Sequence, residues 1–477
     1  MMQKQNNPFL YNCVYFIGIG GIGMSALARY FKARGVEKVL GYDLTPSSLT
    51  ETLQKEGIAV HYNDLGSEVL NGLTPSDTLV IYTPAVPQTH GELQAFLKAG
   101  FRVEKRAQAL GEAVAQQELY AVAGTHGKTT TSTLLAHLLH SSVGSNAFLG
   151  GISANFRSNL LIDKNSSRVV AEADEYDRSF LRLYPHCAIV TATSPDHLDI
   201  YGTEESYKQG FRDFVEQIER GGTLFYRKGT FEEEQLPKAV HSFSYLSNWK
   251  KDMPQEKADI YSDNVRLEKE ELYFDWHFPK QKIHFKDLRL HTPFPINAEN
   301  ATAAIAAALL AGASEEQIRS GLATFKGVKR RFEFVLRSEK QILIDDYAHH
   351  PEELRASISS ITRLFPNEPI LGIFQPHLYS RTKDFYHEFA QALSALDQVI
   401  LLPIYPAREE PIPGVSSELI LDELPQKDKW LVKREDFLQF MSSYPLSIPR
   451  VVVTVGAGNI DRLVEPLAAL LKEKEKK

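Results

Sequence analysis

The chain has 477 residues, of which 43% are hydrophobic and 24% charged, with a formal net charge of −7. These values are ordinary for a folded globular protein, and the negative charge argues against a nucleic-acid-binding surface. Only two cysteines occur, the first twelve residues lack the apolar core of a signal peptide, and no apolar run could span a bilayer, so we expect a cytoplasmic protein without disulfides or membrane contact.

The first part of the chain alternates strand-like and helix-like segments. In chain order they are VYFIGIG, GMSALARYFKARG, KVLGYDL, DTLVIYTPAV and RAQALGEAVAQQ. The first, third and fourth are predicted strands, and the others are predicted helices. Such alternation is typical of a parallel sheet covered by helices. We expect a Rossmann-like domain over residues 1–117.

A second α/β unit is predicted to begin at ELYAVAGTHGKTT and to cover residues 118–328. Its predicted strands include RVVAEADE and CAIVTAT. Residues 258–293 differ, because their polar and apolar residues alternate, which predicts antiparallel hairpins. Two helices follow, ENATAAIAAALLAG and the capped SEEQIRSGLATF.

A third unit, residues 329–477, is predicted to repeat the α/β alternation. Its strands are QILIDDY, PILGIF, QVILLPIY and RVVVTVG, with amphipathic helices between them. The expected fold is therefore α/β with three domains: a Rossmann-like N-terminal domain, a central P-loop-type ATPase domain with antiparallel hairpins, and a C-terminal Rossmann-like domain.

The first glycine motif is G-I-G-G-I-G, with Gly18, Gly20 and Gly23 in a G-x-G-x-x-G pattern. It follows a predicted strand and opens a helix, a context that favours binding of a pyrophosphate at the helix N-terminus. Asp43 lies about 20 residues on, where a ribose hydroxyl is expected. A turn without a ligand is the alternative, and the motif does not separate NAD from another nucleotide diphosphate.

The second motif is G-T-H-G-K-T, residues 124–129. The full P-loop pattern would need a glycine where Val122 stands, so the match is incomplete. Backbone N–H groups can still surround phosphate oxygens, Lys128 can reach the β/γ region, and Thr129 can hold Mg²⁺ through its hydroxyl. A simple helix cap would leave the G-K-T triplet unexplained. Two such motifs favour an ATP-driven enzyme that acts on a nucleotide-linked substrate.

An ordered set of motifs along nearly the whole chain resembles the Mur ligases, the ATP-dependent amide-forming enzymes of peptidoglycan synthesis. After the two glycine motifs, the matching segments are EADEYDRSF, DHLDIYG, NAEN, KRRF, DDYAHHP and PHLYSRT. The set is most similar to the members that add L-alanine to UDP-N-acetylmuramate.

The resemblance implies that the first domain holds the UDP-sugar, the second ATP and the third the amino acid. The sugar's lactyl carboxylate would take the γ-phosphate, and the amine of L-alanine would attack the acyl phosphate. The implied UDP-sugar contacts are Gly18, Gly20, Gly21, Gly23, Asp43 and His126. The implied ATP contacts are Gly124, Thr125, His126, Gly127, Lys128, Thr129, Thr130, Asn297, Asn300, Arg331 and Asp346.

The resemblance further implies L-alanine contacts and a metal site. The implied alanine contacts are Tyr347, His349 (or His350), His377 and Arg381. The implied ligands of Mg²⁺ (or Mn²⁺) are Thr129, Glu172 and His197, and the implied catalytic residues are Lys128, Glu172 and His197.

Several of these residues have simpler interpretations. The acidic loop, residues 172–177, is interpreted as mostly solvated, and within it the resemblance makes only Glu172 a metal ligand. The asparagines before the alanine-rich helix resemble helix caps, and Arg331 resembles a basic linker residue. Two family patterns also differ here: G-x-H-N reads FPIN, and T-N-I-E reads TATS at residues 191–194.

Three other functions stay open at this point. One is a murein-peptide recycling ligase, which attaches a whole peptide to the same sugar nucleotide. The others are an NAD-dependent oxidoreductase and a nucleotide-binding module without catalysis. We expect small-molecule partners, no nucleic acid, and a monomer or homodimer.

Overall fold

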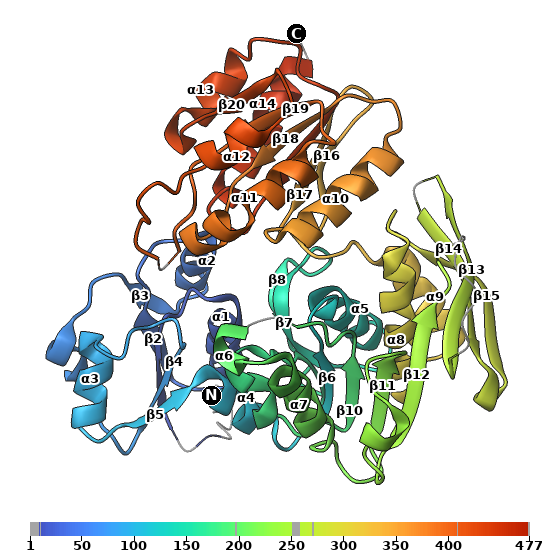
Figure 1. Cartoon of the computed structure of the whole chain (residues 1–477). Coiled ribbons are helices and arrows are strands. Elements are labelled where there is room, and N and C mark those ends of the chain that lie inside the picture. The colour runs from blue at the N-terminus through green and yellow to red at the C-terminus, as the bar shows by residue number, and fades with distance from the viewer. Residues whose placement is uncertain are drawn as a thin grey trace. The chain divides into compact units, whose positions relative to one another are not determined.

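A computed structural model describes residues 9, 11–195, 198–249, 258–269, 271–407 and 409–475, without the side chains of Leu198 and Asp199. The chain divides into two compact units, Met1–Gly327 and Val328–Lys477. The described strands form three sheets, two in the first unit and one in the second. Figure 1 shows the first unit from blue to yellow and the second from orange to red.

The first sheet is parallel and has the strand order β3-β2-β1-β4-β5. Its strands are β1 Cys13–Ile17, β2 Lys38–Tyr42, β3 Ala59–His61, β4 Thr78–Tyr82 and β5 Arg102–Lys105. Its helices are α1 Ile22–Ala33, α2 Ser48–Lys55, α3 Gly91–Lys98 and α4 Arg106–Val114, with a 3-10 turn, η1, at Gly66–Leu70. The strand order changes direction at β1, so the loop after β1 lies where open α/β sheets bind ligands.

The second sheet is mixed, with the order β15-β14-β13-β12-β11-β10-β6-β9-β7-β8. Its strands are β6 Glu118–Ala123, β7 Asn146–Ser153, β8 Ser158–Leu161, β9 Arg168–Glu172, β10 Cys187–Val190, β11 Thr223–Arg227, β12 His241–Ser247, β13 Ile260–Glu268, β14 Glu271–Phe278 and β15 Ile283–Leu290. Strands β13, β14 and β15 pair antiparallel, which confirms the predicted hairpins. The helices are α5 Lys128–His140, α6 Leu198–Tyr201, α7 Glu204–Val215, α8 Ile296–Leu310 and α9 Glu315–Thr324, and a 3-10 segment, η2, covers Tyr176–Arg182.

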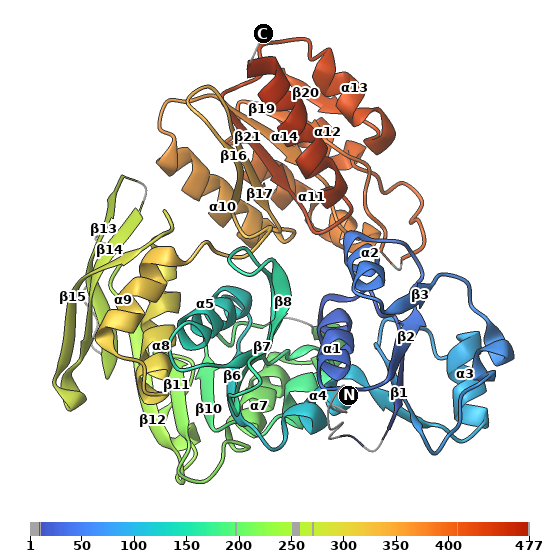
Figure 2. The ribbon, with the colours of Figure 1, turned by 180° about the vertical axis from the view of Figure 1, so that it is seen from behind.

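Helix α8 packs against α5 and against strands β12 and β13 of the second sheet. It is alanine-rich and buried nearly all round, which allows it to pack closely against α5 (Figure 1). The indole Nε1–H of Trp276, on β14, donates to the carbonyl of Thr302 at 3.2 Å, so the hairpins are fastened to this helix. Helix α1 lies beside β7 and β8 (Figure 2), where the side-chain amide of Asn159 donates to the hydroxyl of Ser25 at 2.9 Å.

The third sheet forms the second unit, with the order β16-β17-β21-β18-β19-β20. Its strands are β16 Glu333–Arg337, β17 Ile342–Asp346, β18 Ile370–Phe374, β19 Gln398–Leu401, β20 Lys429–Leu431 and β21 Val451–Val455. Its helices are α10 Pro351–Leu364, α11 Tyr379–Leu393, α12 Glu418–Glu423, α13 Phe437–Ser442 and α14 Asp461–Glu475. All pairings except β16–β17 are parallel.

The two cysteines lie in central strands of the first unit. Cys13 is in β1 and Cys187 is in β10, and both are buried and unpaired. Burial raises the pKa of both thiols. None of the described helices has the length and apolarity needed to cross a bilayer.

Candidate active site

The first glycine-rich turn joins β1 to α1. Gly18 has a φ of 87°, in the left-handed region that favours glycine, and its N–H donates to the carbonyl of Tyr42 at 2.8 Å. Asp43 follows β2 and accepts a hydrogen bond from the N–H of Gly20 at 2.7 Å. A Cβ at residue 20 would lie 2.8 Å from this carboxylate, so glycine lets the turn and Asp43 meet.

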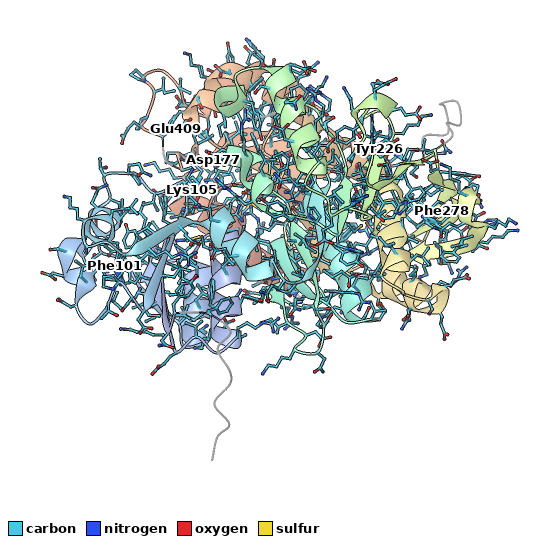
Figure 3. The ribbon with its side chains drawn as sticks, turned by 90° about the horizontal axis from the view of Figure 1, so that it is seen from below. Phe101, Lys105, Asp177, Tyr226, Phe278 and Glu409 are labelled. Atoms are coloured by element: carbon cyan, nitrogen blue, oxygen red, sulfur yellow. The ribbon has the colours of Figure 1, made fainter. Side chains whose placement is uncertain are left out.

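A basic side chain covers the other end of this turn. The guanidinium of Arg106, at the start of α4, lies against Gly23, where a Cβ would come within 2.8 Å of Nη1. Arg106 also pairs with Asp174 of the acidic loop, at 3.3 Å. The neighbouring Lys105 pairs with Asp177 at 2.7 Å (Figure 3). Two ion pairs therefore connect the start of α4 with the acidic loop after β9, and Arg106 also lies against the first glycine-rich turn.

The second glycine-rich turn joins β6 to α5. Gly124 and Gly127 have φ values of 134° and 81°, which again favour glycine. The hydroxyl of Thr191 lies within hydrogen-bond distance of the carbonyls of Ala123, at 3.2 Å, and His126, at 2.5 Å. Thr191 thereby holds both ends of the turn, so the first residue of the unusual TATS segment supports the loop.

The remaining polar residues of this turn differ in burial. Thr129 is buried and Thr130 is half-buried in the first turn of α5. The hydroxyl of Thr125 donates to the carbonyl of Ser194 at 2.7 Å. His126 is exposed. The imidazole of His126 is therefore open to a ligand, whereas Thr129 is held inside the helix start.

Lys128 is directed at the acidic loop. Its Nζ donates to the carbonyl of Gly124 at 2.5 Å and lies 2.8 Å from both carboxylate oxygens of Glu175. Glu175 is only 1% exposed, so the interpretation of the acidic loop as solvated is wrong for this residue. Burial by itself would lower the pKa of the Lys128 ammonium, but the carboxylates of Glu175 and Glu172 outweigh it and hold the pKa above its usual range.

Glu172 ends β9 and lies against Gly150, on β7. A Cβ at residue 150 would overlap the carboxylate, so only glycine leaves room for it. The hydroxyl of Ser132, one turn into α5, lies 3.5 Å from Oε2 of Glu172. Among the described residues no group of three or more His, Cys, Asp or Glu side chains has metal-binding geometry. His197, the third expected metal ligand, lies outside the described residues.

Asn297 and Asn300 lie inside the first turns of α8, which begins at Ile296, so the prediction that they precede the helix is wrong. The helix starts earlier because Pro295 stands at its N-cap with helical dihedrals. The side-chain oxygen of Asn300 accepts a hydrogen bond from the hydroxyl of Thr131 at 3.2 Å and lies 2.9 Å from the position of a Cβ at Gly127. The structure thus brings Asn300 to the second glycine-rich turn.

In the second unit, the four residues expected to contact L-alanine form one cluster. The rings of Tyr347 and His349 are centred 5.2 Å apart, and those of His349 and His377 5.7 Å apart. Nη1 of Arg381, in α11, is buried and has no hydrogen-bond partner among the described residues. Burial lowers the pKa of His349. The carboxylate of Glu353 acts in the opposite direction, and the positive charge of Arg381 lowers the pKa further.

Two expected ATP contacts also lie in the second unit. The guanidinium of Arg331 is exposed and lies 5.2 Å from the centre of the Tyr347 ring. Asp346 ends β17, and its Oδ1 accepts a hydrogen bond from the N–H of Phe332 at 3.3 Å. Burial raises the pKa of Asp346, although Ser357 and Arg331 act against the rise.

Sequence reasoning missed Arg106, Gly150 and the buried position of Glu175. The double glycine in FLGGIS was a signal for Gly150, because glycine within a strand often marks a close approach. For Arg106 and Glu175, no sequence pattern distinguishes them from neighbouring surface charges.

Two glycine-rich turns on two sheets of one unit, the second with a lysine at the start of its helix, define a nucleotide-binding α/β protein. Family models match three consecutive parts of the chain: the catalytic domain of the Mur ligase family over residues 13–118, the Mur ligase middle domain over 122–308, and the Mur ligase glutamate ligase domain over 330–458. The chain belongs to the Mur ligase family and is an ATP-dependent ligase. The resemblance read from the motifs and the three-domain α/β fold are thereby confirmed.

Curated relatives match over almost their full length. UDP-N-acetylmuramate–L-alanine ligase of Porphyromonas gingivalis is 51% identical over 96% of this chain and 99% of its own, and that of Phocaeicola vulgatus is 48% identical over 97% and 98%. Among solved structures, UDP-N-acetylmuramate–alanine ligase of Thermotoga maritima has a TM-score of 0.78 and 26% identity over 97% of this chain and 99% of its own. A murein peptide ligase of Psychrobacter arcticus has a TM-score of 0.69 at 21% identity, over 96% and 98%, and shares the fold.

Proposed function

We propose that this enzyme joins L-alanine to the lactyl carboxylate of UDP-N-acetylmuramate in the cytoplasm, with release of ADP and phosphate, in peptidoglycan precursor synthesis. The observation that carries the proposal is the 51% identity to an L-alanine ligase across 96% of the chain. The three domains proposed to bind the UDP-sugar, ATP and the amino acid cover residues 1–117, 118–328 and 329–477, respectively. A peptide-recycling ligase is disfavoured, because the curated relatives at 51% and 48% identity over at least 96% of this chain are L-alanine ligases.

The two glycine-rich turns receive different nucleotides in this proposal. The first, with Gly18 to Gly23 and Asp43, binds the UDP part of the sugar. The second, residues 124–130, binds the ATP phosphates through backbone N–H groups and Lys128. Asn297 and Asn300 would contact the adenine, an assignment supported by the contact of Asn300 with this turn. Arg331 and Asp346 would complete the ATP contacts.

Glu172 and Thr129 fit a divalent cation by their chemistry. Mg²⁺ usually binds to only one or two protein oxygen ligands, and substrate phosphates and waters complete its coordination. A carboxylate and a hydroxyl can supply these protein ligands. Because residue 150 is glycine, the Glu172 carboxylate can lie directly against β7, and this fixed position supports the assignment. His197 would join them by family resemblance. Bound there, the cation supplies charge neutralisation for the approach of a carboxylate to a triphosphate.

In the reaction, a lactyl carboxylate oxygen attacks the γ-phosphorus and the bond to the ADP oxygen breaks, which leaves an acyl phosphate and ADP. The ammonium of Lys128 stabilises the charge that moves onto the β/γ oxygens. The neutral amine of L-alanine attacks the acyl carbon, and the tetrahedral intermediate expels phosphate and loses the amine proton. His126, exposed beside the turn, is placed to contact the lactyl carboxylate.

The cluster in the second unit would bind L-alanine. Arg381 has a buried guanidinium nitrogen without a partner among the described residues, which suits a bidentate grip on a carboxylate. His377, His349 and Tyr347 line the same cluster. These contacts recognise a free amino acid by its carboxylate.

The test measures phosphate and ADP release with UDP-N-acetylmuramate and a panel of L-alanine, L-serine, glycine and an L-alanyl peptide, with mass spectrometry of the product. We expect turnover with L-alanine and a product heavier by one alanyl residue. Turnover with the peptide alone would support the recycling ligase instead. NAD in place of the sugar nucleotide is the negative control, and tight NAD binding without UDP-sugar binding would refute the ligase assignment.

A further inference from the structure

The ammonium of Lys128 is shared between its own loop and one carboxylate. It donates to the carbonyl of Gly124 at 2.5 Å and lies 2.8 Å from both oxygens of Glu175, while the carbonyl of Thr125 is farther, at 3.5 Å. The side chains of Lys128 and Glu175 are 14% and 2% exposed. Because salt screens buried pairs weakly, this ion pair keeps its strength in solution.

Hydrogen bonds to the main-chain carbonyl of Glu175 anchor the loop that carries its carboxylate. The hydroxyl of Tyr201, at the end of α6, donates to the carbonyl of Glu175 at 2.6 Å, and the N–H of Arg178 donates to the same carbonyl at 3.0 Å. Asp177 and Arg178 have φ values of 52° and 53°, a left-handed conformation that turns the loop back on itself. A loop anchored in this way does not readily carry Glu175 away from Lys128.

We propose that Glu175 competes with the ATP phosphates for the ammonium of Lys128. In ATP binding, Lys128 would then exchange its ion pair with Glu175 for contacts with phosphate oxygens. This inference rests on the proposed function of residues 124–130 as the ATP loop. An ammonium has three N–H donors and a lysine has no further ones to offer. These donors face the carbonyl of Gly124, the carboxylate of Glu175 and, at the longer distance of 3.5 Å, the carbonyl of Thr125. The carboxylate is the one charged partner among the three, so phosphate oxygens compete with Glu175 for the charge of Lys128.

The proposal makes Glu175 a positioning residue that keeps Lys128 charged beside the loop and limits the affinity for ATP. Glu175→Gln retains the shape and an amide oxygen that accepts from Lys128, but it removes the negative charge. We expect it to tighten ATP binding at least fivefold, with no change in the affinity for UDP-N-acetylmuramate. Asp177→Asn is the matched control: it neutralises an acid of the same loop that pairs with Lys105, and asparagine tolerates the left-handed conformation. It should change ATP affinity less than twofold.

The experiment is calorimetric titration of the full chain with ATP and Mg²⁺ and without sugar nucleotide, on the wild type, both single variants, Lys128→Met and the Lys128→Met/Glu175→Gln double variant. In the Lys128→Met background, Glu175→Gln should lose most of its effect, because the cation for which Glu175 competes is gone. An equal effect in both backgrounds would mean plain repulsion between Glu175 and phosphate and would overturn the proposal.

Unchanged or weaker ATP binding by Glu175→Gln would also overturn it, provided that thermal unfolding shows a folded variant. If that variant is unfolded, Glu175→Asp decides: on the anchored loop its shorter side chain draws the carboxylate away from Lys128 but keeps the charge, so tighter ATP binding would support competition, and unchanged or weaker binding would overturn it. A wild type that fails to bind ATP at all would refute the proposed function rather than this inference.

Discussion

The carboxylate of Glu172 lies directly against the α-carbon of Gly150, with no room for a side chain between them. Gly150→Ala would therefore displace Glu172 without altering any polar group. We expect turnover to fall at least about 100-fold, the typical cost of losing one charge-stabilising group. The measurement is the rate of phosphate release over a range of Mg²⁺ concentrations.

Gly372→Ala is the control for crowding, because its Cβ would overlap Leu396 in the second unit, which holds none of the proposed metal ligands. It should lower thermal stability without changing the Mg²⁺ dependence. A Gly150→Ala enzyme with ordinary turnover would remove Glu172 from the catalytic residues.

The last glycine of the first motif leaves space for Arg106. Gly23→Ala would place a Cβ 2.8 Å from Nη1, which forces the guanidinium off the turn. We expect Arg106 to donate to the pyrophosphate bound at this turn, so the KM for UDP-N-acetylmuramate should rise roughly tenfold or more, because a charged hydrogen bond is worth about 1.5–3 kcal/mol. The KM for ATP should change little. Gly111→Ala, on the same helix α4 as Arg106, is the matched control, because its Cβ would crowd the carbonyl of Arg182 without touching the turn. Equal effects of the two substitutions on the KM for UDP-N-acetylmuramate would exclude a role for Arg106.

Arg381 offers a test of the alanine site. Arg381→Lys keeps the charge but loses the planar fork that grips a carboxylate with two hydrogen bonds. The KM for L-alanine should then rise far more than the KM for ATP. If Arg381 instead serves the stability of the second unit, both constants will change alike and the melting temperature will fall.

His137 makes stability dependent on pH. Its Nε2 lies 3.1 Å from the carbonyl of Gly321, which requires a proton on Nε2, and Nδ1 is buried without a partner among the described residues. Burial lowers the pKa of this imidazole, with a smaller contribution from His140. The neutral form is therefore favoured in the fold, and its stability is complete above the unfolded pKa of about 6.5 and declines as the pH falls below it.

Urea unfolding at pH 7.5 and 5 checks this expectation. The wild type should lose about 1.4 kcal/mol for each unit by which the pKa is lowered. His137→Gln keeps a donor for Gly321 and should lose less between the two pH values. The same loss in both proteins would assign the pH dependence to other groups.

The α/β alternation and both glycine-rich turns could be predicted from sequence, because strand and helix periods and glycine spacing are local properties. The hairpins of residues 258–293 were predicted for the same reason, and they are confirmed. Strands β7 and β8 were not predicted, because FLGGIS interrupts its apolar pattern with glycines that serve Glu172.

The surroundings of the site could not be predicted, because they depend on contacts between distant segments. Two residues far from Glu175 in the sequence help to bury it. The hydroxyl of Tyr201, 26 positions later, donates to its carbonyl, and the ammonium of Lys128, 47 positions earlier, donates to its carboxylate. Asp174 and Asp177, from the same acidic loop, are 40% and 35% exposed at their side chains, as expected for solvated acids. Composition alone does not distinguish the three.

The two buried cysteines supply a built-in pair of reporters for local opening. A thiol reacts as the thiolate, so burial and a raised pKa should keep Cys13 and Cys187 from alkylation while their strands stay closed. Because Cys13 lies in the first sheet and Cys187 in the second, the labelling rate of each, followed by peptide mass spectrometry in mild denaturant, reads the opening of its own sheet. The second unit has no cysteine and therefore gives no labelling signal. The order in which the first and second sheets open can thus be measured in the wild-type chain, without any substitution.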